Sequence, residues 1–211
     1  YFTEIIAVRR SGEVAGHDDL LSILAAAEVD GERLSDTDLL NFSFLLLVAG
    51  NETTRNLIAL GTLALIEHPG QFAKLRADPS LLPAAVEEML RFTSPVTHMA
   101  RRATADVEIR GQQIKAGDTV VMLYGSANRD EDVFGPTSET FDITRNPNPH
   151  IAFGAGEHAC LGAQLARLEA RVLFEVLLST YPSIELVGDV TRLCATMVPG
   201  VKHMPVRLGA N

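Results

Sequence analysis

The chain has 211 residues, of which 46% are hydrophobic and 21% charged, and this ordinary balance excludes a wholly disordered protein. Its 18 Lys and Arg against 27 Asp and Glu give a formal net charge of −9, which argues against a dedicated nucleic-acid binder. Two cysteines cannot build a disulfide framework, residues 1–10 lack the order of a signal peptide, and no apolar run reaches the ~20 residues that span a bilayer, so we expect a soluble cytoplasmic protein.

Helical periodicity in the first part of the chain predicts helices over residues 1–10, 20–28 and 35–67. Asp18 and Asp19 are expected to open the second helix and Ser35 to cap the third, because such side chains accept hydrogen bonds from the free amide groups of a first turn. Asp30 and Gly31 between these helices predict a turn. Residues 42–49 are apolar almost all round, which is typical of a helix that runs through the centre of a protein.

Two shorter helices are predicted next, over residues 68–77 and 81–92. Beyond Ser94 the pattern predicts a hairpin over 107–114, a strand over 119–123, an amphipathic helix over 161–180, and small strands at 184–187, 192–198 and 203–208. Residues 128–156 are rich in Pro, Gly, Asn and Asp, and so long an irregular stretch is usually functional. The expected fold class is therefore mainly α with small β-sheets.

The most informative segment is the cysteine loop, residues 153–162, with the sequence Phe-Gly-Ala-Gly-Glu-His-Ala-Cys-Leu-Gly. Its glycines allow tight turns, and Cys160 stands at the mouth of the predicted helix, whose N-terminus favours a thiolate. A thiolate held in this way can be an axial ligand to iron. Two alternatives stay open: Cys160 as inert packing, and a zinc site with His150 and His158, which would need a fourth ligand.

The pattern Phe-Gly-x-Gly-x-His-x-Cys-x-Gly over 153–162, continued by Ala-Gln-Leu-Ala-Arg, resembles the heme-binding signature of the cytochrome P-450 superfamily. Further stretches resemble the family's other motifs in the family's order, at residues 49–54, 88–91, 127–130 and 141–145. The resemblance covers essentially the whole chain. It implies that residues 1–211 are the C-terminal half of a single cytochrome P-450 domain of the bacterial type, with a thiolate-ligated heme b as cofactor.

The resemblance also implies the roles of the residues around the heme. Cys160 would be the proximal thiolate and the metal ligand, and Phe153 would pack beneath the ring beside the sulfur. His158 and Arg101 would pair with the heme propionates. The remaining heme contacts that it implies are Ala49, Gly154 and Gly162.

The helix predicted over residues 35–67 contains residues with low helix propensity. Gly50, Thr53 and Thr54 are weak helix formers, and a Thr hydroxyl can bond back to a carbonyl one turn earlier and make room for a small ligand. Glu52 is an acid in an apolar stretch, where burial is costly unless the group has a task. The resemblance implies that Glu52 relays protons during oxygen activation while Thr53 holds the hydrogen-bond network. The alternative is a solvent-facing Glu52 paired with Arg55.

Glu88 and Arg91 lie three residues apart on one helix face and can pair. The resemblance implies a buried structural triad whose second arginine comes from the irregular segment, and Arg145 is our candidate. The family often has an arginine within the four residues that end at Phe141, where this chain has Thr140.

Substrate contacts are expected near the open face of the heme, although each candidate is equally compatible with ordinary core packing. The candidates are Val48, Ala49, Thr97, His98, Met197 and Val198. Among them, His98 is a polar group that could orient a substrate in an apolar pocket. Cys194 is expected to be a small buried hydrophobe.

The family resemblance implies a monooxygenase that inserts one atom of dioxygen into an apolar substrate such as a sterol, fatty acid or terpenoid. Electrons would come from a ferredoxin-type partner, with Arg167 and Arg171 as candidate anchors. One alternative is a peroxide-driven relative, against which the presence of Glu52 and Thr53 argues, because peroxide brings its own protons. Another is a non-catalytic heme-binding or structural fragment.

Overall fold

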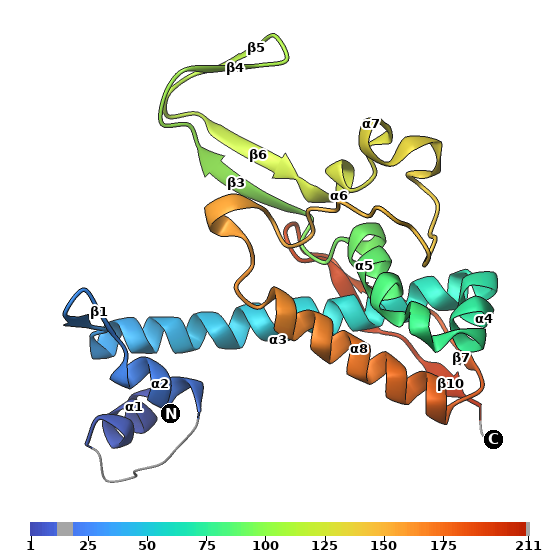
Figure 1. Ribbon diagram of the computed structural model, residues 1–211, viewed down its shortest axis with the longest axis horizontal. Coiled ribbons are helices and arrows are strands. Elements are labelled where there is room, and N and C mark those ends of the chain that lie inside the picture. Colours follow the sequence, from blue (N-terminus) through green and yellow to red (C-terminus); the bar gives the residue numbers. More distant parts are fainter. Residues whose placement is uncertain (12–18, 210–211) are drawn as a thin grey trace. The chain divides into compact units, whose positions relative to one another are not determined.

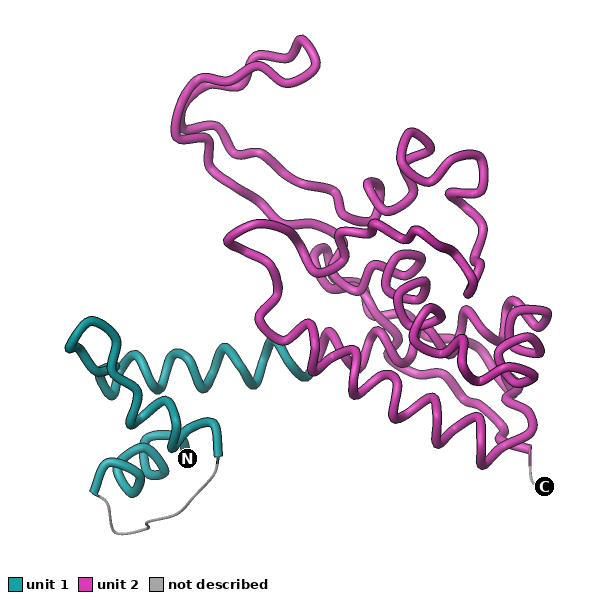
Figure 2. Tube along the Cα trace, viewed as in Figure 1, with its two compact units in different colours: residues 1–51 teal, residues 52–211 magenta. Residues whose placement is uncertain are grey.

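The computed structural model describes residues 1–11 and 19–209 and contains two compact units, residues 1–51 and 52–211 (Figure 2). The division falls within a single long helix, α3 (Asp36–Glu67), and each unit is described here by itself. Asp18, which we expected to help open the second helix, lies outside the described residues. The expected architecture, mainly α-helical with small β-sheets, is confirmed (Figure 1).

The first unit packs short elements around a small apolar core. Its elements are α1 (Phe2–Ser11), α2 (Leu20–Ala26), β1 (Glu28–Val29), β2 (Glu32–Arg33) and the first turns of α3. Ile6, Ala25 and Leu39 form the buried core. Arg10 links α1 to α2, because its Nη1 donates to the Ala25 carbonyl at 2.8 Å.

Capping in this unit follows the sequence, but one helix is shorter than expected. Asp19 accepts from the Ser22 amide at 2.9 Å, and the Ser35 hydroxyl accepts from the Asp38 amide at 3.1 Å. The second helix ends at Ala26 rather than residue 28, because Glu28 pairs with Arg33 in a two-residue hairpin around the predicted turn.

The second unit contains the end of α3 and the remaining helices. They are α4 (Pro69–Ala77), η1 (Pro79–Leu81), α5 (Leu82–Thr93), α6 (Tyr124–Ala127), α7 (Glu131–Phe134), η2 (Gly135–Thr137), η3 (Gly156–His158) and α8 (Ala163–Thr180). The predicted helix over 161–180 begins two residues late, since Gly162 is its N-cap and the Ala163 amide donates to the Cys160 carbonyl in the turn before it.

The strands of the second unit form separate antiparallel pairs. They are β3 (His98–Arg102) with β6 (Thr119–Leu123), β4 (Val107–Ile109) with β5 (Gln112–Ile114), β7 (Ile184–Leu186) with β10 (Val206–Leu208), and β8 (Thr191–Leu193) with β9 (Gly200–His203). We did not predict β3, because its sequence His-Met-Ala-Arg-Arg has no clear alternation. Residues 194–198, expected to be strand, lie outside β8.

The core of the second unit lies where α3, α5 and α8 meet. A Cβ atom added at Gly61 would lie 2.7 Å from the Met89 sulfur and 3.3 Å from the Phe174 ring, so a glycine is what lets these helices approach. The largest fully buried apolar side chains around this crossing are Leu57, Leu65, Leu75, Met89, Phe141, Ile143 and Phe174.

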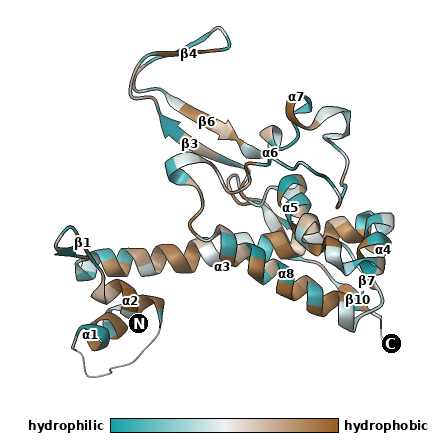
Figure 3. Cartoon of the chain, viewed as in Figure 1, coloured by the Kyte–Doolittle hydropathy of each residue, from teal (hydrophilic) through white to brown (hydrophobic). Residues whose placement is uncertain are grey.

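The all-round apolar stretch of α3 is not buried as expected. Phe44 is 62% exposed and Leu45 58% exposed, although α3 is one of the strongly apolar segments in Figure 3. The core of the first unit takes Leu39 from this helix and leaves the following turns outside. Apolar composition favours burial but does not ensure it, so the prediction that this stretch is buried in the centre of the protein is wrong. Among residues 1–11 and 19–209, no helix combines the length and apolar character that crossing a membrane requires.

Candidate functional site

The cysteine loop folds back on itself and presents its thiol to the outside. The Cys160 amide donates to the Phe153 carbonyl at 2.8 Å, and the Ala159 amide donates to the Gly156 carbonyl at 3.0 Å. Gly154 has φ +70°, and a Cβ there would lie 3.2 Å from the His158 carbonyl oxygen, so the turn needs glycine. Cys160 is exposed and stands three residues before α8, which has 18 residues. The positive end of that helix dipole favours a thiolate.

This donor set fits a thiolate-ligated heme better than the alternatives. An exposed thiol contradicts inert packing for Cys160. The described residues hold no group of three or more His, Cys, Asp and Glu that could bind a metal ion, and the His150 ring is engaged by Glu87 at 2.9 Å rather than by Cys160. A heme iron needs only one axial ligand from the chain, because the porphyrin supplies four nitrogens.

The residues expected at the propionates and in the signature lie on different elements. Arg101 is half-buried in β3, opposite Val120, and its Nη1 donates to the Ala100 carbonyl at 2.9 Å. His158 is exposed at the end of η3. Gly162 caps α8, and a Cβ there would lie 4.0 Å from the Cys160 sulfur, which is ordinary contact.

The structure places Glu52 in solvent rather than in an apolar interior. Its side chain is 50% exposed, and its Oε1 lies 3.8 Å from Nη2 of Arg55. The expected burial of this acid is therefore wrong, and the geometry is the solvent-facing pair that we weighed as the alternative. Thr53 is half-buried one residue later. Val48 and Ala49 belong to the first unit and are exposed on α3.

The other candidate substrate residues come together from distant parts of the sequence. The Thr97 amide donates to the Met197 carbonyl at 2.9 Å, and the Thr97 hydroxyl donates to the Thr196 carbonyl at 2.8 Å. With its hydrogen used there, the same hydroxyl accepts from His98 Nδ1 at 3.1 Å, which leaves His98 Nε2 as an acceptor. Val198, the next residue of the tail, is half-buried.

Glu88 is the centre of a buried charged cluster. Arg91 donates to both of its carboxylate oxygens at 2.8 Å, and Arg145 Nε lies 3.2 Å from Oε2. The structure thus brings our candidate for the third member to Glu88. Asn148 Nδ2 adds a further donor at 3.1 Å. At Thr140, where the family often has arginine, the backbone carbonyl accepts from Arg91 and Arg145 at 2.8 and 3.0 Å.

Asn128 is a residue that the sequence reasoning missed. Its carbonyl accepts from Arg91 at 2.8 Å, its Nδ2 donates to the Ser94 hydroxyl at 2.9 Å, and its Oδ1 accepts from the Ile151 amide at 2.8 Å. It is fully buried and fixes the irregular segment to α5. Its place in the matched stretch 127–130 was a signal, but that stretch has no periodicity from which burial could be inferred.

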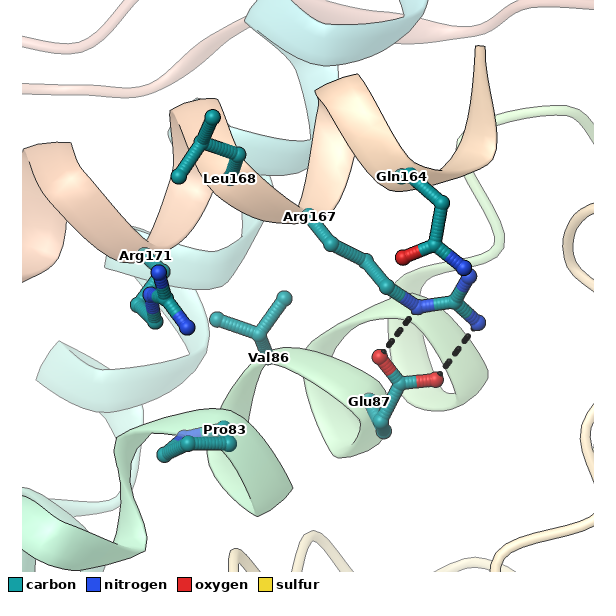
Figure 4. Close-up of a pocket in the computed structure, with 7 residues that line it drawn as sticks. All are labelled: Pro83, Val86, Glu87, Gln164, Arg167, Leu168 and Arg171. Atoms are coloured by element: carbon teal, nitrogen blue, oxygen red, sulfur yellow. Dashed lines mark hydrogen bonds and ion pairs between the residues drawn. The ribbon is translucent and has the colours of Figure 1, made fainter. Parts of the chain in front are cut away.

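A second missed group surrounds Glu87, next to Glu88 on α5. Arg167 on α8 donates its Nε and Nη2 to the Glu87 carboxylate at 2.7 and 2.9 Å (Figure 4). His150 Nε2 lies 2.9 Å from the same carboxylate. Arg167 is therefore held by an intramolecular ion pair, and its role as an anchor for a partner stays a prediction. Its periodic position on an amphipathic helix could not reveal a partner 80 residues away.

Burial and hydrogen bonding in this group shift the pKa values of Glu87 and Arg167. Burial raises the pKa of Glu87, but the hydrogen bonds from His150 and Arg167 and the charge of Arg167 outweigh it and lower that pKa from 4.5 to about 2. The hydrogen bonds to Glu87 raise the pKa of Arg167 against the effect of burial, and the charges of Glu87 and Cys160 add to the rise. The pair is therefore ionised at neutral pH.

Cys194, expected to be buried, is exposed. It directly follows β8, at the point where the chain leaves the strand. That prediction is wrong.

Comparison with known proteins identifies the same family across most of the chain. The family model described as Cytochrome P450 matches residues 2–193. A methyl-branched lipid omega-hydroxylase of Mycobacterium tuberculosis is 49% identical over 208 residues, which are 98% of this chain and 48% of that protein. A steroid C26-monooxygenase of the same organism is 48% identical over 204 residues, 95% of this chain and 50% of that protein.

Solved structures agree with this match. Cytochrome P450 PksS of the bacillaene polyketide synthase from Bacillus subtilis has a TM-score of 0.93 and 44% identity, over 99% of this chain and 54% of that one. CYP109E1 from Bacillus megaterium, in complex with corticosterone, has a TM-score of 0.92 and 41% identity, over 98% of this chain and 55% of that one. The chain spans about half the length of the relatives it matches.

Proposed function

The chain belongs to the cytochrome P450 family, and on this premise we propose that its protein is a heme-thiolate monooxygenase that inserts one oxygen atom of dioxygen into an apolar organic substrate. Members of this family are heme-thiolate enzymes. The observation that carries the proposal is the cysteine loop, which presents an exposed thiol at the N-terminus of α8. In this proposal residues 1–211 are the C-terminal part of a single catalytic domain.

Cys160 would hold the iron through its thiolate, the negative charge of which the α8 N-terminus would stabilise. The hydrogen bond from the Cys160 amide to the Phe153 carbonyl fixes the peptide that carries the thiol. Gly154 keeps the loop tight enough for the ring of Phe153 to pack beside the sulfur, and Gly162 leaves space next to it. When bound, the heme supplies the oxygen activation that no amino-acid side chain provides.

Arg101 and His158 orient the cofactor by pairing with its propionates. The Arg101 guanidinium provides several donors in a planar fork, which suits a carboxylate. His158 sits at the exposed end of η3, two residues before Cys160, so an anionic group near the thiol lies within its reach.

Glu52 and Thr53 move protons toward the reacting oxygen. In the observed conformation the Glu52 carboxylate faces solvent beside Arg55, where it can take up a proton. Thr53 follows it on α3 and is half-buried, so its hydroxyl is the inner group of the pair. A carboxylate and a hydroxyl in sequence are sufficient to pass a proton from water to an interior site.

The substrate is an apolar molecule, of the sterol, fatty-acid or terpenoid type. One relative is named a steroid C26-monooxygenase, another a methyl-branched lipid omega-hydroxylase, and both names indicate extended apolar substrates. The hydrogen bonds of Thr97 to the tail hold Met197 beside His98, so the tail and β3 line one site. His98 Nε2 is then the polar group that orients a hydroxyl of the substrate. Val198 supplies an apolar contact.

The reaction needs two electrons and two protons, because the second oxygen atom of dioxygen leaves as water. We propose a ferredoxin-type protein as the electron donor, in the cytoplasm. We propose that this donor approaches the cysteine side of the heme, because electrons then have the shortest path to the iron, through the loop that holds Cys160.

The test is the absorption spectrum of the reduced, carbon monoxide-treated protein, purified as its gene encodes it. The wild type should show the long-wavelength band of a thiolate-ligated heme, and Cys160→Ser should abolish that band. Cys194→Ser is the matched control, because both cysteines are exposed, and it should leave the band unchanged. A band that survives Cys160→Ser contradicts the proposal.

Turnover separates the remaining alternatives. Hydroxylation of a steroid or branched fatty acid that depends on ferredoxin, its reductase and dioxygen supports the monooxygenase. Turnover with hydrogen peroxide alone identifies a peroxide-driven enzyme. If the purified protein binds no heme, it is the non-catalytic structural fragment.

A further inference from the structure

The cluster around Glu87 has a geometry more specific than a surface ion pair. Arg167 approaches the Glu87 carboxylate side-on, with Nε 2.7 Å from Oε1 and Nη2 2.9 Å from Oε2 (Figure 4). Such a fork restricts both side chains to one relative orientation, unlike a contact made by a point charge. It joins α5 to α8, the helix that begins just after Cys160.

His150 links the same carboxylate to the backbone that leads into the cysteine loop. The Ala152 amide donates to His150 Nδ1 at 3.2 Å, so the ring proton lies on Nε2 and is donated to Glu87 Oε2 at 2.9 Å. The His150 side chain is only 4% exposed. Glu87 therefore anchors the chain three residues before the loop begins as well as the helix that follows it.

Phe153 connects this anchor to the thiol. The Arg167 guanidinium carbon lies 4.6 Å above the centre of the Phe153 ring, within the range of a cation–π contact. The carbonyl of the same residue accepts the Cys160 amide at 2.8 Å. Phe153 therefore contacts Arg167 through its ring and holds the peptide that carries the sulfur through its backbone carbonyl.

We propose that Glu87, Arg167 and His150 are positioning residues that hold Phe153 and, through its carbonyl, fix the Cys160 thiolate and so set the reduction potential of the heme. This inference rests on the proposed heme-thiolate function. Groups just outside a metal's ligands commonly orient the ligand and tune the metal in this way. None of the three touches the iron or the substrate.

The chain offers a matched control in Arg129. Its guanidinium carbon lies 4.5 Å above the Phe92 ring, and the same residue pairs with Glu139, so it repeats the arginine, phenylalanine and glutamate arrangement away from the cysteine loop. Arg167→Lys and Arg129→Lys each keep the charge and remove a guanidinium that pairs with a glutamate and lies over a phenylalanine ring. A loss of general stability affects both variants, whereas a change at the thiolate affects only the first.

The experiment measures two properties of the heme-loaded protein. One is the midpoint potential of the heme, and the other is the rate at which the reduced carbon monoxide complex loses its long-wavelength thiolate band. We expect Arg167→Lys and Glu87→Gln to lose the band about tenfold faster than the wild type and to shift the potential, with Arg129→Lys close to the wild type. The Glu87→Gln/Arg167→Lys double variant should be no worse than either single variant, since the two residues act as one unit.

The outcomes are distinct. If Arg167→Lys and Glu87→Gln match Arg129→Lys in both measurements, or if their effects add in the double variant, the inference is overturned while the proposed function stands. If the wild type itself lacks the thiolate band, the proposed function fails, and the inference fails with it.

Discussion

Two acid–arginine pairs with the same spacing occupy opposite environments in this molecule. Glu88 and Arg91 on α5 are three residues apart and both 0% exposed, with Nε and Oε2 at 2.8 Å. Glu52 and Arg55 on α3 are also three apart, but their side chains are 50% and 56% exposed and the contact is 3.8 Å. A spacing of three residues allows the two side chains to pair, but it does not determine how much the pair contributes to stability.

The difference comes from the rest of the chain. Around Glu88 the irregular segment supplies Arg145, Asn148 and the carbonyl of Thr140, so the buried charges are fully hydrogen-bonded. Glu52 and Arg55 are half-exposed, and an exposed pair of this kind contributes little to stability. The buried pair therefore stabilises the fold more than the exposed pair does.

The largest effect should follow removal of the buried acid. Glu88→Gln leaves the buried charge of Arg91 uncompensated, and we expect it to lower the free energy of unfolding by about 3–5 kcal/mol. Denaturant unfolding of the heme-loaded protein measures this, with Glu52→Gln as the control at matched spacing. A loss as small as that of the control would show that burial does not distinguish the two pairs.

The next effect concerns activity at the exposed acid. Glu52→Gln removes the group that takes up a proton, and we expect turnover to fall about 10²-fold with substrate affinity nearly unchanged. Glu52→Asp should recover part of the rate. Turnover in Glu52→Gln equal to that of the wild type would remove Glu52 from the proton path.

A smaller effect tests the geometry of the buried cluster. Arg145→Lys keeps the charge but loses the simultaneous contacts to Glu88 and to the carbonyls of Thr137 and Thr140. We expect a loss of about 1–2 kcal/mol in the free energy of unfolding, the value of a hydrogen bond to a charged group. Equal stability of the lysine variant would mean that charge alone matters there.

The pH dependence of Glu87 sharpens the comparison, because this acid is intermediate in burial. Its pKa is lowered from 4.5 to about 2, so its contribution to stability is fully present above pH 4.5 and is lost as the pH falls toward 2. The melting temperature of the wild type should therefore exceed that of Glu87→Gln at pH 6, and the gap should narrow as the pH falls through this range. A gap that stays constant down to pH 3 contradicts the assignment.

The smallest effect should come from the exposed pair itself. Arg55→Gln should change the free energy of unfolding by less than about 0.5 kcal/mol, and raising the salt concentration should reduce even that. The same unfolding measurement detects it. A larger loss would indicate that the contact between Glu52 and Arg55 is stronger than its exposure implies.

The sequence was sufficient for most helices and for several short strands. Ser35 as a cap, the turn at Asp30 and Gly31, and the amphipathic pattern of α8 are local signals, and local signals determine local structure. The glycines and the cysteine of the loop gave the position of the candidate site for the same reason. Glu88 and Arg91 could be paired by spacing.

What the sequence could not supply were the contacts between distant segments. The partner of Arg167 lies 80 residues away, and the segment that fills the space above Glu88 has no periodicity. The burial of Phe44, Glu52 and Cys194 was predicted wrongly. Residue type indicates only a preference for burial, whereas the elements that pack against a side chain decide whether it is buried. The strand at residues 98–102 was missed because its pairing with β6, not its composition, defines it.

The tight crossing at Gly61 has a consequence for how this protein can diversify. Even a single methyl group there meets the Met89 sulfur at 2.7 Å, so random mutagenesis along α3 should leave a gap in the tolerated substitutions at that one position. Variation in the side chains of α3 is then expected mainly in the turns of the helix before this crossing. The contact between Gly61 and the Met89 side chain therefore limits which residues this turn of α3 can carry.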